Sequence, residues 1–239
     1  MDEKKYKFTN ETITFLGKVL RRIEALKDFT DVKKGDKGGF IESEKNLSQK
    51  GNCWIYDNAI VYENAKIYEN AGIYNNVNIH GNAKIYGNAR IYNNATIYGN
   101  SIIYENAKIY GNTKVYDNAT IYGNVMICGS AQVYGNATIY ENAVIYDNVK
   151  VCGNTTICGN AEISGNATVF NDTDYIVFKN WWSSGRYFTW TRSNNMWRVG
   201  CFYGSGKELI EKAYKDSKLS GKEYKRVVDY VESIINEEI

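Results

Sequence analysis

The chain has 239 residues, with 29 Lys and Arg against 27 Asp and Glu, so its net charge is close to zero. This balance excludes a protein that binds nucleic acid through bulk positive charge, although local contact with nucleic acid remains open. Five cysteines without a C-x-x-C pair indicate neither a disulfide framework nor a zinc site, and we expect no metal and no cofactor. The start, MDEKKYKF, is not an apolar signal segment, and no apolar run is long enough to span a membrane. We therefore expect a cytoplasmic protein without a membrane partner.

Residues 1–50 differ in character from the rest of the chain. The open end of a repeat array exposes unpaired backbone and apolar surface, so we expect this region to be a cap. Within it, KVLRRIEAL (Lys18–Leu26) alternates apolar and polar residues loosely, which favours a strand over a short helix. GDKGGF (Gly35–Phe40) is typical of a turn.

From Asn52 to Phe170 the sequence repeats every six residues without insertion or deletion. Every sixth residue from Ile55 is Ile or Val in 20 of 20 cases, and Asn stands three places earlier in 19, Ser130 being the exception. A small or β-branched residue, usually Ala, stands two places before each Ile or Val, and Tyr stands directly after the Ile or Val 14 times. The β-branched residue suits a short strand that faces a narrow core. The Gly-Asn and Asp-Asn pairs tolerate the left-handed backbone of a tight turn.

Six residues thus form one side of a triangular coil, and three hexapeptides close a turn. Residues eighteen apart then stack at about 4.8 Å, and the corner Asn side chains can form amide ladders. Strict hexapeptides favour a left-handed parallel β-helix, since the right-handed kind has irregular coils. We predict a mainly β fold with an N-terminal cap over residues 1–50, a β-helix of 20 hexapeptides in six to seven coils over 51–170, and a small α+β domain over 171–239.

After Phe170 the composition shifts to Trp, Arg and Phe. Ser205 with Glu208 forms a capping-box pattern that opens a helix ending near Asp216, and Ser220 with Glu223 repeats the pattern for a second helix. Three segments before them are predicted strands: Tyr175–Lys179, Arg186–Thr191 and Met196–Tyr203.

Two segments resemble known proteins. GGFIESEKNLSQKGNCWIYDNA (Gly38–Ala59), which leads into the repeats, resembles the N-terminal region of left-handed β-helix proteins of bacteria and prophages labelled acyltransferase-like. The tail, with SGR (Ser184–Arg186), GCFYG (Gly200–Gly204) and paired helices, is similar to a C-terminal module of phage and prophage proteins. The resemblance implies a phage or prophage origin and a cytoplasmic setting. It carries over no functional residue, because a fold does not imply a function.

His80 is the one histidine of the chain, and it stands where most repeats have Tyr. The β-helix acyltransferases need a histidine base near the acyl thioester, usually in a cleft between subunits. A drift from Tyr to His in a solvated column explains His80 more simply, and we favour that interpretation. One histidine cannot supply the several ligands of a metal-dependent hydratase. The chain also lacks the long loops that bind nucleotide or coenzyme A in such enzymes.

Aromatic residues provide two candidate binding surfaces. The outward Tyr residues form three columns; their stacked rings shield the strand backbone, and Tyr is also common at interfaces. In the tail, aromatic and cationic residues interleave, which suits a protein hot spot or stacking on bases, although a small core with solvated arginines is the simpler interpretation. The candidate residues are Tyr68, Tyr86, Tyr104 and Tyr122 of one column, and Trp181, Trp182, Arg186, Trp190, Arg192, Trp197 and Arg198 of the tail.

These features favour a non-enzymatic interaction protein of phage or prophage origin that binds a host protein or a ribonucleoprotein. An inhibitor of a host defence system, such as an anti-CRISPR protein, is the sharpest form of this hypothesis. One Tyr face can also form a homo-oligomer. The alternatives are a hexapeptide-repeat acyltransferase that uses His80 and a structural protein of a phage particle or polymer. We expect no binding of acetyl-coenzyme A, because no loop or basic pocket is available for its pyrophosphate.

Overall fold

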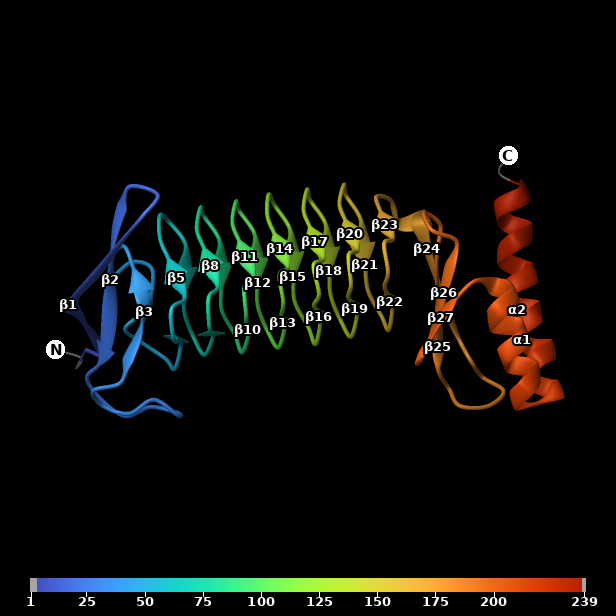
Figure 1. Ribbon diagram of the computed structural model, residues 1–239, viewed down its shortest axis with the longest axis horizontal. Helices are drawn as coiled ribbons and strands as arrows, with labels where there is room; N and C mark the ends of the chain where they lie inside the picture. Colours follow the sequence, from blue (N-terminus) through green and yellow to red (C-terminus); the bar gives the residue numbers. More distant parts are fainter. Residues whose placement is uncertain (1–3, 238–239) are drawn as a thin grey trace.

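The computed structural model describes residues 4–237 of the chain. Figure 1 shows an elongated molecule, with a β-solenoid between an N-terminal strand assembly and a C-terminal unit of a small sheet and two helices. Three strands form the N-terminal assembly: β1 (Tyr6–Phe15), β2 (Lys18–Ala25) and β3 (Lys37–Ile41).

Three parallel sheets form the sides of the solenoid, and every strand in them has two residues. The first side consists of β4 (Trp54–Ile55), β7 (Gly72–Ile73), β10 (Arg90–Ile91), β13 (Lys108–Ile109), β16 (Met126–Ile127), β19 (Val144–Ile145) and β22 (Glu162–Ile163). The second side consists of β5 (Ile60–Val61), β8 (Asn78–Ile79), β11 (Thr96–Ile97), β14 (Lys114–Val115), β17 (Gln132–Val133), β20 (Lys150–Val151) and β23 (Thr168–Val169). The third side consists of β6 (Lys66–Ile67), β9 (Lys84–Ile85), β12 (Ile102–Ile103), β15 (Thr120–Ile121), β18 (Thr138–Ile139) and β21 (Thr156–Ile157).

The predicted register of the repeat is confirmed. Each predicted inward Ile or Val is the second residue of its strand, and its side chain is buried in one continuous core. Three hydroxyl residues replace the usual inward Ala, and each donates a hydrogen bond to the carbonyl three residues earlier, so no polar group is left unpaired there. They are Ser101, Thr113 and Thr155, with distances of 2.8, 2.6 and 2.7 Å. The parallel β-helix of about seven turns is therefore confirmed.

The corners of the solenoid carry two kinds of side-chain ladder. The predicted amide ladder is present; for example, Asn64 donates to Asn82 at 3.1 Å, and Asn82 donates to Asn100 at 3.0 Å. A second ladder was not predicted. The carboxylate of Glu69 accepts the backbone N–H of Gly87, one turn away, at 2.9 Å. Acid and glycine alternate along this column, so like charges never stack directly on each other, which would be destabilising. The column is Glu69, Gly87, Glu105, Gly123, Glu141 and Gly159.

The N-terminal assembly continues the second side of the solenoid. β1 and β2 form an antiparallel hairpin, β2 pairs with β3, and β3 pairs in parallel with β5. The strand predicted over Lys18–Leu26 is confirmed as β2. The turn predicted over Gly35–Phe40 is wrong beyond its first residues, because Lys37 begins β3. A Cβ at Gly38 or Gly39 would lie closer than 3.0 Å to a carbonyl oxygen of the first coil. These glycines therefore permit close approach of two strands rather than a turn.

The C-terminal unit contains one more strand than the sequence predicts. The predicted strand over Met196–Tyr203 is a hairpin that turns at Gly200, whose φ is 55°. The first helix begins after the capping box of Ser205, as predicted. The second capping-box prediction is wrong, since the second helix already begins at Lys218 and Ser220 lies inside it. The elements are η1 (Asp172–Asp174), β24 (Tyr175–Lys179), β25 (Tyr187–Thr191), β26 (Met196–Val199), β27 (Phe202–Gly204), α1 (Gly206–Asp216) and α2 (Lys218–Glu237).

The C-terminal unit also closes the solenoid. In the inner turns the N–H of the first residue of each strand donates to a carbonyl seventeen residues later, as Thr138 does to Thr155. The last turn has no following coil, and three side-chain oxygens accept these N–H groups instead. The pairs are Thr156 with Asp172 at 2.6 Å, Glu162 with Thr189 at 2.9 Å and Thr168 with Ser193 at 2.7 Å. The sequence predicted a cap at one end only, and the structure has one at each end.

Candidate functional site

His80 lies directly after β8, in the aromatic column of the second side. Its ring stacks between Tyr62 and Tyr98, with centroids 5.0 and 5.1 Å away and nearly parallel planes. Its Nδ1 is 3.7 Å from Oε2 of Glu63, and the imidazole is 27% exposed. Burial lowers the pKa of His80 below its usual value, although the Glu63 carboxylate opposes this effect. The ring is therefore mostly neutral near pH 7 and able to accept a proton.

The N-terminal assembly brings further charged groups to this position. Oε2 of Glu63 accepts the backbone N–H of Gly81 at 2.8 Å, which fixes the carboxylate beside His80. Glu42, at the end of β3, accepts the backbone N–H of Glu63 at 2.6 Å and the ammonium of Lys18 at 3.2 Å. The N–H of Glu63 and then Lys18 lower the pKa of Glu42. The 3.7 Å between Nδ1 of His80 and Oε2 of Glu63 is longer than a hydrogen bond, so Glu63 acts on the imidazole through its negative charge.

Sequence reasoning missed this carboxylate, although the sequence contains a signal for it. Glu63 precedes His80 by seventeen residues, one short of a full turn of eighteen. The repeat therefore places the acid at the corner beside the histidine. No pattern in the sequence places Lys18 and Glu42 near His80, because their position depends on how the N-terminal strands join the solenoid.

The Tyr column of the third side is a regular stack. Successive rings of Tyr68, Tyr86, Tyr104 and Tyr122 have centroids 4.7 to 5.0 Å apart and lie nearly parallel. Each ring is partly exposed, so the outward orientation predicted for Tyr is observed. Stacking accounts for this arrangement by itself. Contact of the column with a macromolecule stays a prediction.

The Trp residues of the tail do not form one surface. Trp190 and Trp197 are 1% and 2% exposed and lie in the core of the C-terminal unit, where a partner cannot reach them. Trp182 is partly buried and packs edge-on against Tyr224. Trp181, at 81% exposed, is open to solvent. The candidate surface of interleaved aromatic and cationic residues is thus interrupted, because half of its tryptophans form the core, as the simpler interpretation of the tail predicted.

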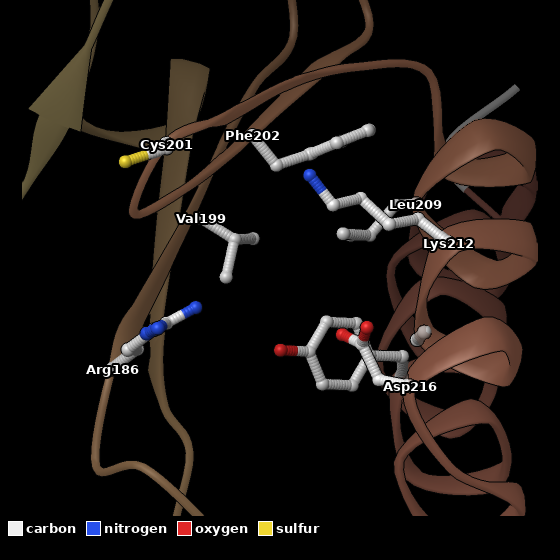
Figure 2. Close-up of a pocket in the computed structure, with 9 residues that line it drawn as sticks. Arg186, Val199, Cys201, Phe202, Leu209, Lys212 and Asp216 are labelled. Atoms are coloured by element: carbon white, nitrogen blue, oxygen red, sulfur yellow. The ribbon is translucent and has the colours of Figure 1, made fainter.

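The tail arginines have three different surroundings. Arg198 lies over the ring of Tyr146 at 4.8 Å and 3.6 Å from Glu162, so it joins the C-terminal unit to the solenoid. Arg192 lies 4.0 Å from Asp174. Arg186 lines a cavity between the C-terminal sheet and the helices (Figure 2). The three arginines therefore lie in separate places and do not form one cationic surface.

Two kinds of feature are absent from the part of the chain that the structure describes. No group of three or more His, Cys, Asp or Glu side chains among residues 4–237 is placed to hold a metal ion. Neither α1 nor α2, over its described residues, is both long and apolar enough to cross a membrane.

Comparison with known proteins gives a match within the solenoid. A family model described as the YdcK β-solenoid repeat matches residues 83–99, 89–105 and 131–147. A curated protein, the "Uncharacterized acetyltransferase YdcK" of Escherichia coli (strain K12), is 58% identical to this chain over 43 residues. The aligned part covers 18% of this chain and 13% of the relative's length. The comparisons therefore support the β-solenoid repeat directly.

The expectation of a non-enzymatic phage protein that acts against host defence is wrong on this finding. The relative is named an acetyltransferase, which favours the acyltransferase alternative. The single histidine and the uninterrupted coils were the reasons against an enzyme. A general base requires one imidazole, and the structure gives that imidazole a carboxylate partner. Neither comparison supports a phage origin or the resemblance of the tail to a phage module.

Proposed function

We propose that this protein transfers an acyl group from a thioester to a hydroxyl or amine acceptor, with His80 as the general base. The observation that carries the proposal is the neutral, partly exposed imidazole with its Nδ1 3.7 Å from the held carboxylate of Glu63. The name of the relative that matches the repeat supports this class of reaction. The solenoid supplies a rigid frame, since every coil is bonded to the next.

The proposed step uses the other ring nitrogen, Nε2. It takes the proton of the acceptor as the acceptor's oxygen or nitrogen attacks the thioester carbonyl. The tetrahedral intermediate collapses by breaking the C–S bond, and the imidazolium returns the proton to the leaving thiolate. Glu63 stabilises the imidazolium in between, and the stack between Tyr62 and Tyr98 holds the ring in place. The His80 ring is partly exposed at the side of the solenoid, and the proposal takes the opposite wall of a substrate cleft from a second copy of the chain.

The test is thiol release from acetyl-coenzyme A with a panel of amine and hydroxyl acceptors. The proposal requires this thioester to bind, and it therefore replaces the expectation from the sequence that acetyl-coenzyme A does not bind. His80→Tyr is the matched variant, because it restores the residue that most repeats carry and preserves the stack with Tyr62 and Tyr98. We expect turnover to fall by about 10²-fold or more with an unchanged melting temperature. Glu63→Gln should lower turnover and shift its pH profile, as befits a positioning residue. Turnover that survives in His80→Tyr, or no thiol release by the parent with any acceptor, would contradict the proposal.

A further inference from the structure

A cavity lies in the C-terminal unit, away from His80. It encloses about 50 Å³ between the edge of the sheet and α1 and α2. Its floor is apolar, with Val199 from the sheet and Leu209 and Ala213 from α1. Figure 2 shows Arg186 on the sheet side, facing Lys212 and Asp216 on the helix side. Charged groups thus stand beside the apolar floor of the cavity.

These charged groups have no ion-pair partners among residues 4–237. Lys212 and Asp216 are four residues apart on α1, a spacing at which opposite charges usually pair. Here they do not pair; the Lys212 ammonium lies 5.6 Å over the ring of Phe202. Neither Asp216 nor the Arg186 guanidinium makes an ion pair within the described part of the chain. Two positive charges and one negative charge therefore remain available to a ligand.

We propose that this cavity binds a small apolar α-amino acid in its zwitterionic form. Arg186 and Lys212 suit the α-carboxylate, Asp216 suits the α-ammonium, and the floor receives the side chain. A simple anion would leave Asp216 without a partner, and a simple cation would leave Arg186 and Lys212 without one.

The size of the cavity limits the ligand. A water molecule needs about 10–15 Å³ of such volume, so the cavity holds about four non-hydrogen atoms, with the charged ends of the ligand at the open rim. Alanine fits this limit, and a nucleotide does not.

The test is a ¹H–¹⁵N nuclear magnetic resonance titration of the full chain with L-alanine, propionate and ethylamine. L-Alanine should give saturable shifts in α1, β26 and β27. Propionate and ethylamine each lack one charged group and should bind at least about tenfold more weakly, as expected for the loss of one charge-assisted hydrogen bond. Arg186→Gln and Asp216→Asn should each weaken the binding of L-alanine by the same factor.

Lys215→Gln is the control, because Lys215 is an exposed neighbour of Asp216 that does not line the cavity. It should leave binding unchanged. The changed residues are all exposed, and an unaltered amide spectrum outside the cavity will show that each variant is folded. Binding of propionate as tight as that of L-alanine would overturn recognition of a zwitterion. The absence of saturable shifts with L-alanine at high millimolar concentration would overturn the site itself.

Discussion

At each end of the solenoid, the outermost coil has backbone groups that no further coil can pair. The two ends pair these groups with different partners. At the N-terminal end, β3 adds a strand, and its backbone N–H groups, such as that of Phe40, donate to carbonyls of the first coil. At the C-terminal end, side-chain oxygens from η1, from β25 and from the loop after β25 accept the last free N–H groups. The N-terminal cap pairs backbone with backbone, so it depends on close approach of β3 to the first coil and hence on glycine. A side-chain cap depends on particular oxygen atoms. The two ends should therefore respond to different substitutions.

The coils between the ends provide the reference for this comparison and the largest expected effect. Ile97→Asp places an unpaired charge in the core, which costs several kcal/mol and should unfold the whole array, caps included. Tyr98→Ser removes one partly exposed ring of a stack and should cost about 1 kcal/mol. Thermal unfolding followed by circular dichroism distinguishes the two variants. Equal melting temperatures would show that the inward and outward positions are wrongly assigned.

At the N-terminal end, Gly39→Val should separate the cap from the solenoid. The added Cβ collides with the backbone of Ala59, which cannot move without breaking the pairing of β3 with β5. Overpacking of this kind costs about 3 kcal/mol. Hydrogen exchange should show loss of protection in β3 and retained protection in the inner coils. Lys37→Ala, an exposed change in the same strand, is the control and should leave exchange unaltered. Protection of β3 that persists in Gly39→Val would contradict the close-approach role of this glycine.

At the C-terminal end, Thr189→Val should have a smaller and more local effect. Val keeps the shape of Thr but cannot accept the N–H of Glu162, and an unsatisfied buried N–H costs about 1–3 kcal/mol. The amide of Glu162 should exchange faster, while β3 at the other end is unaffected. Thr189→Ser retains the hydroxyl and should restore most of the protection. If Thr189→Ser and Thr189→Val behave alike, the hydroxyl is not the capping group.

The smallest expected effect is a pH dependence of stability that the N-terminal end should show and the C-terminal end should not. The pKa of Glu42 is lowered in the folded protein, first by the N–H of Glu63 and then by Lys18. A lowered folded pKa means that the stabilisation is present above the usual glutamate pKa of about 4.3 and is lost as the pH falls through the folded pKa. The difference in melting temperature between the parent and Glu42→Gln should therefore disappear in acid.

The matched comparison is Thr189→Val. The Thr189 hydroxyl does not titrate, so Thr189→Val should lower the melting temperature by the same amount at neutral and at acidic pH. A pH-independent effect of Glu42→Gln would show that the charge of this carboxylate does not stabilise the N-terminal cap.

The sequence by itself determined the register of the solenoid. Each hexapeptide carries its own strand residue and its own turn pair, and contacts between coils occur at a fixed separation of eighteen residues. Local pattern and long-range packing therefore coincide, which is why the inward Ile and Val residues could be assigned individually. The pairing of Glu63 with His80 follows from the same period and could have been found.

Tertiary structure alone decided the parts outside the repeat. Gly38 and Gly39 have the composition of a turn, yet they lie in a strand because another backbone packs against them. Trp190 and Trp197 are the same residue type as Trp181, and only the packing of α1 and α2 on the small sheet separates core from surface. Outside the repeat, the residues that contact each other are separated by irregular distances along the sequence, so no local pattern indicates which residues are in contact. The position of a side chain then depends on the packing of the whole unit.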